Sequence, residues 1–216
     1  MKNFIQYDIP KLKRVDSDSG RVYETPTGQR YPSVTSVTGI VNQQSISAWR
    51  SKVGEERATA VSTKASKRGT AVHSLCENYL LSGAACSSIA DLEMFNSLVP
   101  HLNRIDNIHC LETQLFSHHL QVAGTVDCIA EYDGGLAVID FKTASKPKRE
   151  EWISHYFMQC AAYSFMFWER TKVSCSKMIV LVGVDDHQPQ LFEQPVKPWL
   201  EKFVSIREQF RREKGI

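Results

Sequence analysis

Apolar residues in the first half of the chain recur every three or four positions, which is the spacing of amphipathic helices. This pattern predicts its longest helix over residues 55–81 and another over residues 91–105. The segment Arg68-Gly69-Thr70 predicts an interruption of the first helix, with Thr70 as the N-cap of its second part, because glycine disfavours helix and threonine often caps it. A proline at position 100 predicts a kink in the second helix.

The pattern is weaker before residue 55. Residues 1–20 are polar and show no period, so they predict an N-terminal arm, with a single folded domain over residues 21–216. Residues 21–34 predict two short strands around the turn Pro26-Thr27-Gly28. Two short helices are expected next, over residues 36–41 and 45–53.

After residue 105 the period changes to the alternation typical of strands. Strands are predicted over residues 109–116, 120–132 and 136–142, with Asp133-Gly134-Gly135 as a tight hairpin turn. A helix over 150–170, strands over 178–184 and 190–192, and a final helix opened by Pro198 are predicted to follow. This order is typical of an α/β or α+β domain.

Composition narrows the function classes only slightly. A chain of 216 residues can build its own core, and its formal net charge of +2 means that any surface for nucleic acid must be local. No apolar run could cross a bilayer and no signal-peptide core is present, so we expect an intracellular, cytoplasmic protein without a membrane partner. The six cysteines lack the spacing of zinc or redox motifs, and buried free thiols are expected.

Residues 124–144 place three charges in two otherwise apolar strands. If the turn at 133–134 has two residues, Asp127 lies opposite Asp140 on one face of the sheet. Two opposed carboxylates repel each other unless a cation lies between them. Lys142 projects from the same face, two residues beyond Asp140. The pattern therefore favours a cation site, and its alternative is a surface ion triad on a one-sided sheet.

Two pairs of residues on predicted helices add to this pattern. His73 and Glu77 are four residues apart, so an imidazole and a carboxylate can approach one cation together, although an exposed ion pair is the common alternative. Gln159 and Tyr163 likewise share one face of a later helix, whose other aromatic residues indicate core.

In combination these residues resemble the PD-(D/E)XK nuclease superfamily. The order and spacing are those of its RecB-like exonuclease branch: His73-x3-Glu77, Gly124-Thr-Val-Asp127, Asp140-Phe-Lys142 and Gln159-x3-Tyr163. Within that branch, residues 22–185 are similar to the group of mitochondrial genome maintenance exonucleases and small phage exonucleases. Val126 replaces the proline of the family name, as is common in this branch. The resemblance implies a restriction-endonuclease-like core, with a central mixed sheet flanked by helices.

The resemblance also implies a divalent metal held by His73, Asp127 and Asp140, with the backbone carbonyl of Phe141 as a further ligand. The metal would be Mg2+ or Mn2+, since carboxylates suit both and an imidazole ligand favours manganese. Some relatives hold an iron–sulfur cluster through one early cysteine and a C-terminal trio. No cluster is expected here, because the last third of the chain holds only two cysteines.

Lys142 would be catalytic beside Asp127 and Asp140, and Glu77 would support the metal site or a second metal. The lysine would orient or deprotonate the attacking water, or offset negative charge during attack. A role as base requires a lowered pKa of Lys142, which burial and a neighbouring cation favour. The residues expected to bind DNA or to support the site are Trp49, Arg50, Arg68, Thr125, Thr143, Lys146, Lys148, Gln159 and Tyr163.

The implied function is metal-dependent hydrolysis of DNA by an exonuclease, on single strands or free ends, in replication, recombination or repair with the proteins of those processes. Two alternatives remain open: a structure-selective endonuclease on the same site, and a non-catalytic DNA-binding module. The joint presence of Asp127, Asp140 and Lys142 argues against the second, because a silent module does not need all three.

Overall fold

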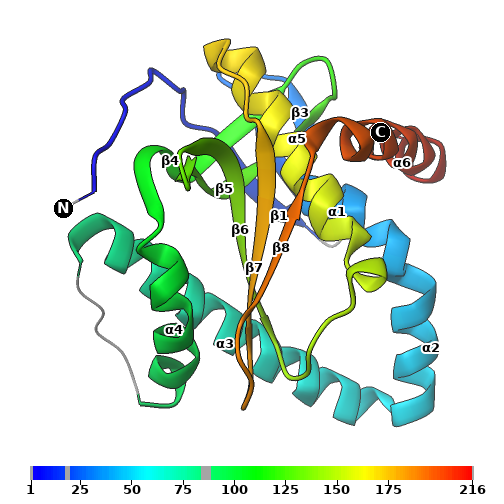
Figure 1. Cartoon of the computed structure of the whole chain (residues 1–216). Helices are drawn as coiled ribbons and strands as arrows, with labels where there is room; N and C mark the ends of the chain where they lie inside the picture. Colours follow the sequence, from blue (N-terminus) through cyan, green and yellow to red (C-terminus); the bar gives the residue numbers. More distant parts are fainter. Residues whose placement is uncertain (1, 18–19, 84–88, 216) are drawn as a thin grey trace.

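The computed structural model describes residues 2–17, 20–83 and 89–215, and its largest feature is a five-stranded sheet flanked by helices (Figure 1). This mixed α/β architecture confirms the predicted fold class. The strands are β1 (Lys13–Ser17), β2 (Gly20–Glu24), β3 (Arg30–Pro32), β4 (Ile105–Ser117), β5 (Val122–Tyr132), β6 (Gly135–Ala144), β7 (Lys177–Val184) and β8 (Gln190–Gln194). The helices are α1 (Val34–Gly39), α2 (Gln43–Val53), α3 (Glu55–Ser82), α4 (Ile89–Leu102), α5 (Ser154–Thr171) and α6 (Val196–Lys214), with short 3-10 turns η1 (Ile40–Asn42) and η2 (Glu150–Trp152).

The five-stranded sheet is mixed, with the order β4-β5-β6-β7-β8. β6 and β7 are parallel, and the other neighbouring strands are antiparallel. A parallel pair needs a crossover connection, which α5 provides. One core joins the sheet to α1, α5 and α6, and a second joins its other face to α3 and α4.

The β5–β6 hairpin has the two-residue turn that the sequence predicts. Asp133 and Gly134 form it with φ values of 51° and 74°, and Tyr132 pairs with Gly135. Positive φ at both central residues suits the twist of an antiparallel pair. The register follows from this turn.

β5 and β6 then separate. Their pairing ends at Cys128 and Ile139, beyond which β5 continues beside β4 and β6 continues beside β7. Asp127 and Asp140 are the next residues on the two strands. The register of the paired residues agrees with the predicted one; continued by one pair, it sets Asp127 opposite Asp140 where the strands are no longer paired.

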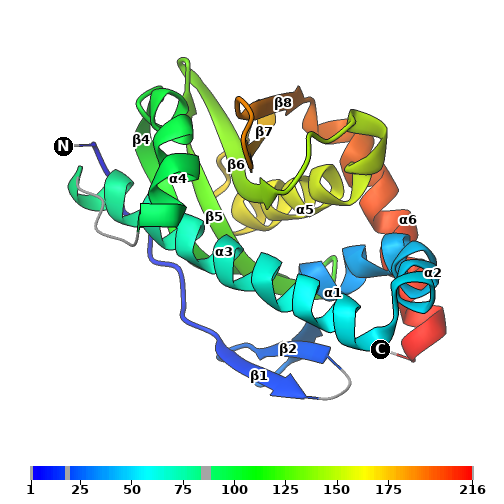
Figure 2. The same ribbon diagram turned by 90° about the horizontal axis from the view of Figure 1, so that it is seen from below.

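Helix α3 runs unbroken over 28 residues and crosses the sheet (Figure 2). The predicted interruption at Arg68-Gly69-Thr70 is therefore wrong, and Thr70 caps nothing. A Cβ at Gly69 would lie 3.8 Å from Oγ1 of Thr143 on β6, so the helix passes close to the sheet at this glycine. Val72 and Leu75 are buried just beyond it, and their packing offsets the roughly 1 kcal/mol that glycine costs a helix.

The N-terminal residues are more regular than predicted. The expected N-terminal arm, residues 1–20, includes the strand β1 at Lys13–Ser17, which its sequence pattern did not predict. β1, β2 and β3 form a small antiparallel sheet, which confirms the two short strands expected next to it. Tyr23 packs with Phe116 and Ala123 of the large sheet. This contact fixes the small sheet against β4 and β5.

The boundary between α4 and β4 also differs from the predicted one. α4 ends at Leu102, with Pro100 in its last turn, and β4 begins at Ile105, four residues before the expected start. Ile105 is buried and pairs with Tyr132, so strand pairing decides its state.

The cysteines and the helix lengths bear on two predictions made from composition. The five described cysteines, Cys76, Cys110, Cys128, Cys160 and Cys175, are buried free thiols as predicted, and Cys86 lies outside the described residues. Across the described ranges, no helix combines the length and the apolar character needed to cross a membrane.

Helix α6 offers a direct test of the packing. The side chain of Phe203 is fully buried in the core shared with α5, whereas Val204 is 44% exposed. Phe203→Ala is expected to lower the free energy of unfolding by about 3–5 kcal/mol through the cavity it leaves, and Val204→Ala to change it by less than about 0.5 kcal/mol. Chemical denaturation followed by circular dichroism measures both, and equal effects would contradict this placement of α6.

Candidate active site

A cavity of about 340 Å³ lies beside the point where β5 and β6 separate. Its walls come from α3, β4, β5, β6, α5 and the small N-terminal sheet. Six of the predicted site residues line it: His73, Thr125, Asp127, Lys142, Gln159 and Tyr163. The fold therefore brings together residues from motifs that are far apart in the sequence.

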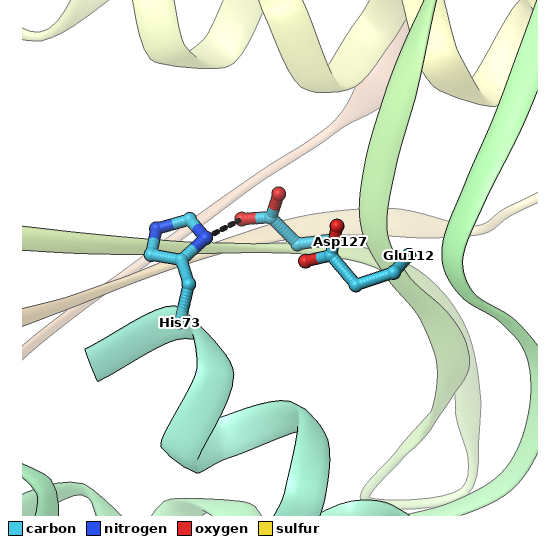
Figure 3. Close-up of side chains that lie close together, drawn as sticks. All are labelled: His73, Glu112 and Asp127. Carbon is cyan, nitrogen blue, oxygen red and sulfur yellow. Dashed lines mark ion pairs between the residues drawn. The ribbon is translucent and has the colours of Figure 1, made fainter. Parts of the chain in front are cut away.

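Three side chains in this cavity point toward one another (Figure 3). His73 comes from α3, Glu112 from β4 and Asp127 from β5, and one ligand atom of each lies within 4.8 Å of the other two. Nδ1 of His73 is 3.5 Å from Oδ2 of Asp127. An imidazole and two carboxylates in this arrangement are a suitable donor set for a divalent cation.

Glu112 is absent from the residues predicted from the sequence. Leu111 pairs with Cys128 and Thr113 with Val126, so Glu112 lies across from Asp127 on the neighbouring strand. Its φ of 46° interrupts the extended backbone at that point. The sequence shows an acid in the predicted strand 109–116. Its position across from Asp127 follows only from the register of β4 and β5.

The pKa of Glu112 reflects desolvation first and nearby like charges second. Desolvation of its carboxyl group raises its pKa to about 7, although the residue as a whole is exposed, and the charges of Asp127 and Glu77 act in the same direction. Lys142 opposes this shift. Glu77 is thus close enough to influence the site, but it is not one of the three clustered ligands.

Asp127 is tied to β6 through a backbone group. Its Oδ2 accepts a hydrogen bond of 2.8 Å from the backbone N–H of Phe141, beyond the last paired residues of the hairpin. In an extended strand the N–H and C=O of one residue point to the same side. The carbonyl of Phe141 therefore also faces the β5 side, where the predicted ligand would have to be.

Asp140 is buried beneath the cavity and holds Lys142. Its Oδ1 accepts hydrogen bonds from Nζ of Lys142 at 2.5 Å and from Nε2 of Gln159 at 3.0 Å. Its Oδ2 is also 2.5 Å from Nζ but has no well-aligned hydrogen bond within the described residues. Asp140 lies outside the tight cluster of His73 and its partners, and its second oxygen retains acceptor capacity.

Burial raises the pKa of Asp140 to about 6; Lys142 counteracts this shift and Asp127 adds to it. For Lys142, burial lowers the pKa as expected, but the carboxylates of Asp140 and Asp127 outweigh it and leave the pKa above its usual value. The expected lowering of the pKa of Lys142 includes a neighbouring cation and stays a prediction. With its pKa raised, Lys142 is a charged donor.

Tyr163 closes the floor of the cavity against Gly124. A Cβ at Gly124 would lie 2.6 Å from the hydroxyl oxygen of Tyr163, so only glycine allows this approach. Burial raises the pKa of Tyr163 well above its usual value. Its hydroxyl is consequently a neutral group at the edge of the site.

Other predicted residues lie outside the cavity lining. Arg68 forms an ion pair with Asp185, which links α3 to the segment after β7. Lys146 is exposed, and the backbone of Lys148 is hydrogen-bonded to the side chain of Gln190. Thr143 contacts the passing α3 helix at Gly69, as described above.

Trp49 and Arg50 on α2, also expected to bind DNA or to support the site, do not line this cavity either. Trp49 is 37% exposed, and Arg50 forms an ion pair with Glu55 at the start of α3. Arg50 lines a different cavity of about 610 Å³ between these helices.

The small N-terminal sheet contributes two residues that sequence reasoning missed. Arg14 of β1 and Arg21 of β2 line the cavity of the clustered ligands. They lie in a polar segment without periodicity, so no local pattern sets them apart from other basic residues.

The residues present fit a divalent cation. The carboxylates and imidazole of the cluster converge, and desolvation together with the charges of Asp127 and Glu77 raises the pKa of Glu112. A cation bound there would offset the repulsion among these acids.

Comparison with known proteins identifies a family. A sequence profile of the PD-(D/E)XK nuclease superfamily matches residues 90–212, more than half of the chain. This range includes Asp127, Asp140 and Lys142.

Curated relatives match over a shorter stretch. Mitochondrial genome maintenance exonuclease 1 of Mus musculus is 45% identical over 47 residues, which cover 22% of this chain and 14% of the relative. The protein of the same name from Xenopus tropicalis is 47% identical over 53 residues, 24% of this chain and 15% of the relative. The match thus spans only a small part of these relatives.

Two solved structures align with the chain at low identity. A proposed exonuclease from Eubacterium rectale aligns with a TM-score of 0.47 and 10% identity, over 68% of this chain and 66% of the other. The protein SSO0001 aligns with a TM-score of 0.43 and 18% identity, over 82% and 74% of the two chains.

The convergence of three ligands predicts that Glu112 contributes to cation binding. Glu112→Gln is expected to weaken Mn2+ binding about 10-fold or more, because it removes a charged ligand. Glu131→Gln is the matched control. Glu131 lies on β5, but its carboxylate accepts a hydrogen bond from the side chain of Asn107 and is not one of the clustered ligands. Isothermal titration calorimetry compares the variants, and unchanged affinity in Glu112→Gln would remove this residue from the ligand set.

Proposed function

The chain belongs to the PD-(D/E)XK nuclease superfamily, and we propose that it is a divalent-metal-dependent deoxyribonuclease that acts as an exonuclease on DNA with free ends, preferably single-stranded. The observation that carries this proposal is the convergence of His73, Glu112 and Asp127 in the cavity that Lys142 also lines. Activity in replication, recombination or repair, with the partners of those processes, is part of the same proposal.

The metal would be held by His73, Glu112 and Asp127, with Asp140 and the carbonyl of Phe141 as further ligands. A bound Mg2+ or Mn2+ would lower the pKa of a water molecule and neutralise charge on the phosphate. The imidazole of His73 favours support of activity by manganese.

Lys142 is the group of this chain proposed to act on the reacting atoms. Its ammonium lines the cavity and is held by Asp140, which is in turn fixed by Gln159. A charged lysine at this position can donate a hydrogen bond to the attacking water or to a phosphate oxygen as negative charge develops. Asp140 is therefore proposed to have two tasks: its carboxylate orients the lysine, and it serves as a further ligand of the metal.

Glu77, Thr125 and Tyr163 are proposed to support this centre. Glu77 adds negative charge beside Glu112, while Thr125 and the hydroxyl of Tyr163 lie in or at the cavity wall. The basic residues outside the cavity, Arg50, Arg68, Lys146 and Lys148, with Trp49 and Thr143, remain proposed DNA contacts along the path to the site.

Removal of the lysine should separate cutting from binding. Lys142→Ala is expected to reduce cleavage at least about 100-fold, since it removes charge stabilisation at the reacting phosphate, while DNA affinity changes much less. Lys214→Ala is a control that removes the same charge from an exposed position at the end of α6, outside the cavity and apart from the proposed DNA contacts. Gel assays of cleavage and fluorescence anisotropy of binding measure both, and full cleavage by Lys142→Ala would exclude the lysine from the mechanism.

The requirement for an end is tested with linear and circular single-stranded DNA of one sequence. We expect linear DNA, labelled separately at each end, to be degraded with Mg2+ or Mn2+ while the circle stays intact. A cut circle would identify an endonuclease on the same site. Binding without cleavage of either DNA in millimolar Mn2+ would identify a non-catalytic DNA-binding module.

A further inference from the structure

The β1–β2 hairpin forms one wall of the candidate active site. Arg14 and Arg21 line the same cavity as His73, Asp127 and Lys142. In the view of Figure 2 the hairpin lies along α3, on the side away from β6 and β7. Two guanidinium groups thus face a cavity whose other charged groups include the clustered acids.

A shared acid holds the two arginines together. Asp16 pairs with Arg21 across the hairpin, and Arg14 lies two residues before Asp16 on the same face of β1. Nε of Arg14 is 2.9 Å from Oδ2 of Asp16, and Nε of Arg21 is 3.2 Å from Oδ1. The hydrogen bond from Arg14 keeps the pKa of Asp16 below its usual range, so this carboxylate stays charged.

The outer nitrogens of both arginines remain available. Each guanidinium uses Nε for Asp16, and within the described residues its Nη groups make no hydrogen bond. One acid between two arginines leaves a net positive charge. Parallel N–H groups of this kind match the oxygens of a phosphate, which arginine often binds with two hydrogen bonds.

The hairpin is fixed relative to the metal ligands. Tyr23 on β2 is 1% exposed and packs with Ala123 at the start of β5, and Ser33 forms a bridge with Ala123. β5 carries Asp127 four residues later. The distance between the arginine pair and the clustered ligands is therefore set by packed strands and does not depend on a loop.

Stability does not account for this arrangement. Both arginines are substantially exposed, and exposed ion pairs contribute little to folding. Arg30, on the same small sheet, forms a similar ion pair with Glu24 but does not line the cavity. The orientation toward the cavity distinguishes Arg14 and Arg21 from it.

We propose that Arg14 and Arg21 form a phosphate clamp that holds one phosphate of the DNA strand opposite the clustered metal ligands. This inference rests on the proposed function, because it assumes a nucleic-acid strand in the cavity. The clamped group is either a phosphodiester within the strand or a terminal phosphate. In both cases the arginines position the strand and take no part in the chemical step.

The test measures DNA affinity in the Lys142→Ala background, so that cleavage does not interfere. Arg14→Gln and Arg21→Gln are each expected to weaken binding about 10-fold, and each to reduce the slope of log affinity against log salt by about 1. Arg30→Gln removes the same charge from the same sheet and should leave both quantities near the starting values. Circular dichroism checks that the variants are folded.

Oligonucleotides with a 5′-phosphate, a 3′-phosphate or only hydroxyl ends distinguish the two sources of the phosphate. Equal losses on all three substrates identify a phosphodiester, and a loss confined to one phosphorylated end identifies a terminal phosphate. Losses no larger than that of Arg30→Gln on every substrate would overturn the clamp. Failure of the wild-type chain to cut any DNA, with the arginine-dependent losses intact, would instead refute the nuclease proposal and leave the clamp standing.

Discussion

Repulsion among carboxylates at the opening between β5 and β6 is the constraint on which the site depends. Asp127 and Asp140 are the first residues beyond the last paired residues of β5 and β6. Glu112 faces Asp127 from β4. Burial and neighbouring acids raise the pKa values of Asp140 and Glu112, so the ionised forms are costly without added positive charge. Lys142 supplies one charge to Asp140. A divalent cation between Asp127, Glu112 and His73 would supply the rest.

The fold around this opening serves to hold these charges in place. α3 passes close to β6 at Gly69 and delivers His73 one turn later, while α5 presents Gln159 to Asp140 from the other side. Because β6 pairs with β7 in parallel, α5 must cross the sheet between them, and this crossover carries Gln159 and Tyr163 to the site. The small N-terminal sheet adds a wall with two arginines. Side chains from α3, α5 and the small sheet thus converge on the acids.

The parts of this arrangement that depend on local rules could be predicted from the sequence. A two-residue turn sets the register of the β5–β6 hairpin, and the register places Asp127 opposite Asp140. The part played by Glu112 could not be predicted, because it depends on the β4–β5 register and on a residue with positive φ. The interruption predicted at Gly69 is absent because tertiary packing of α3 outweighs the low helix propensity of glycine. Arg14 and Arg21 carry no local signal, since only the docking of the hairpin turns them toward the site.

One cation is expected to bind where β4, β5 and α3 bring Glu112, Asp127 and His73 together. Anomalous diffraction from crystals soaked in Mn2+ tests it most directly, because the signal locates the metal without reference to activity. A strong peak is expected at coordination distance from His73, Glu112 and Asp127. A crystal that binds manganese elsewhere, with these three side chains turned away from one another, would contradict it.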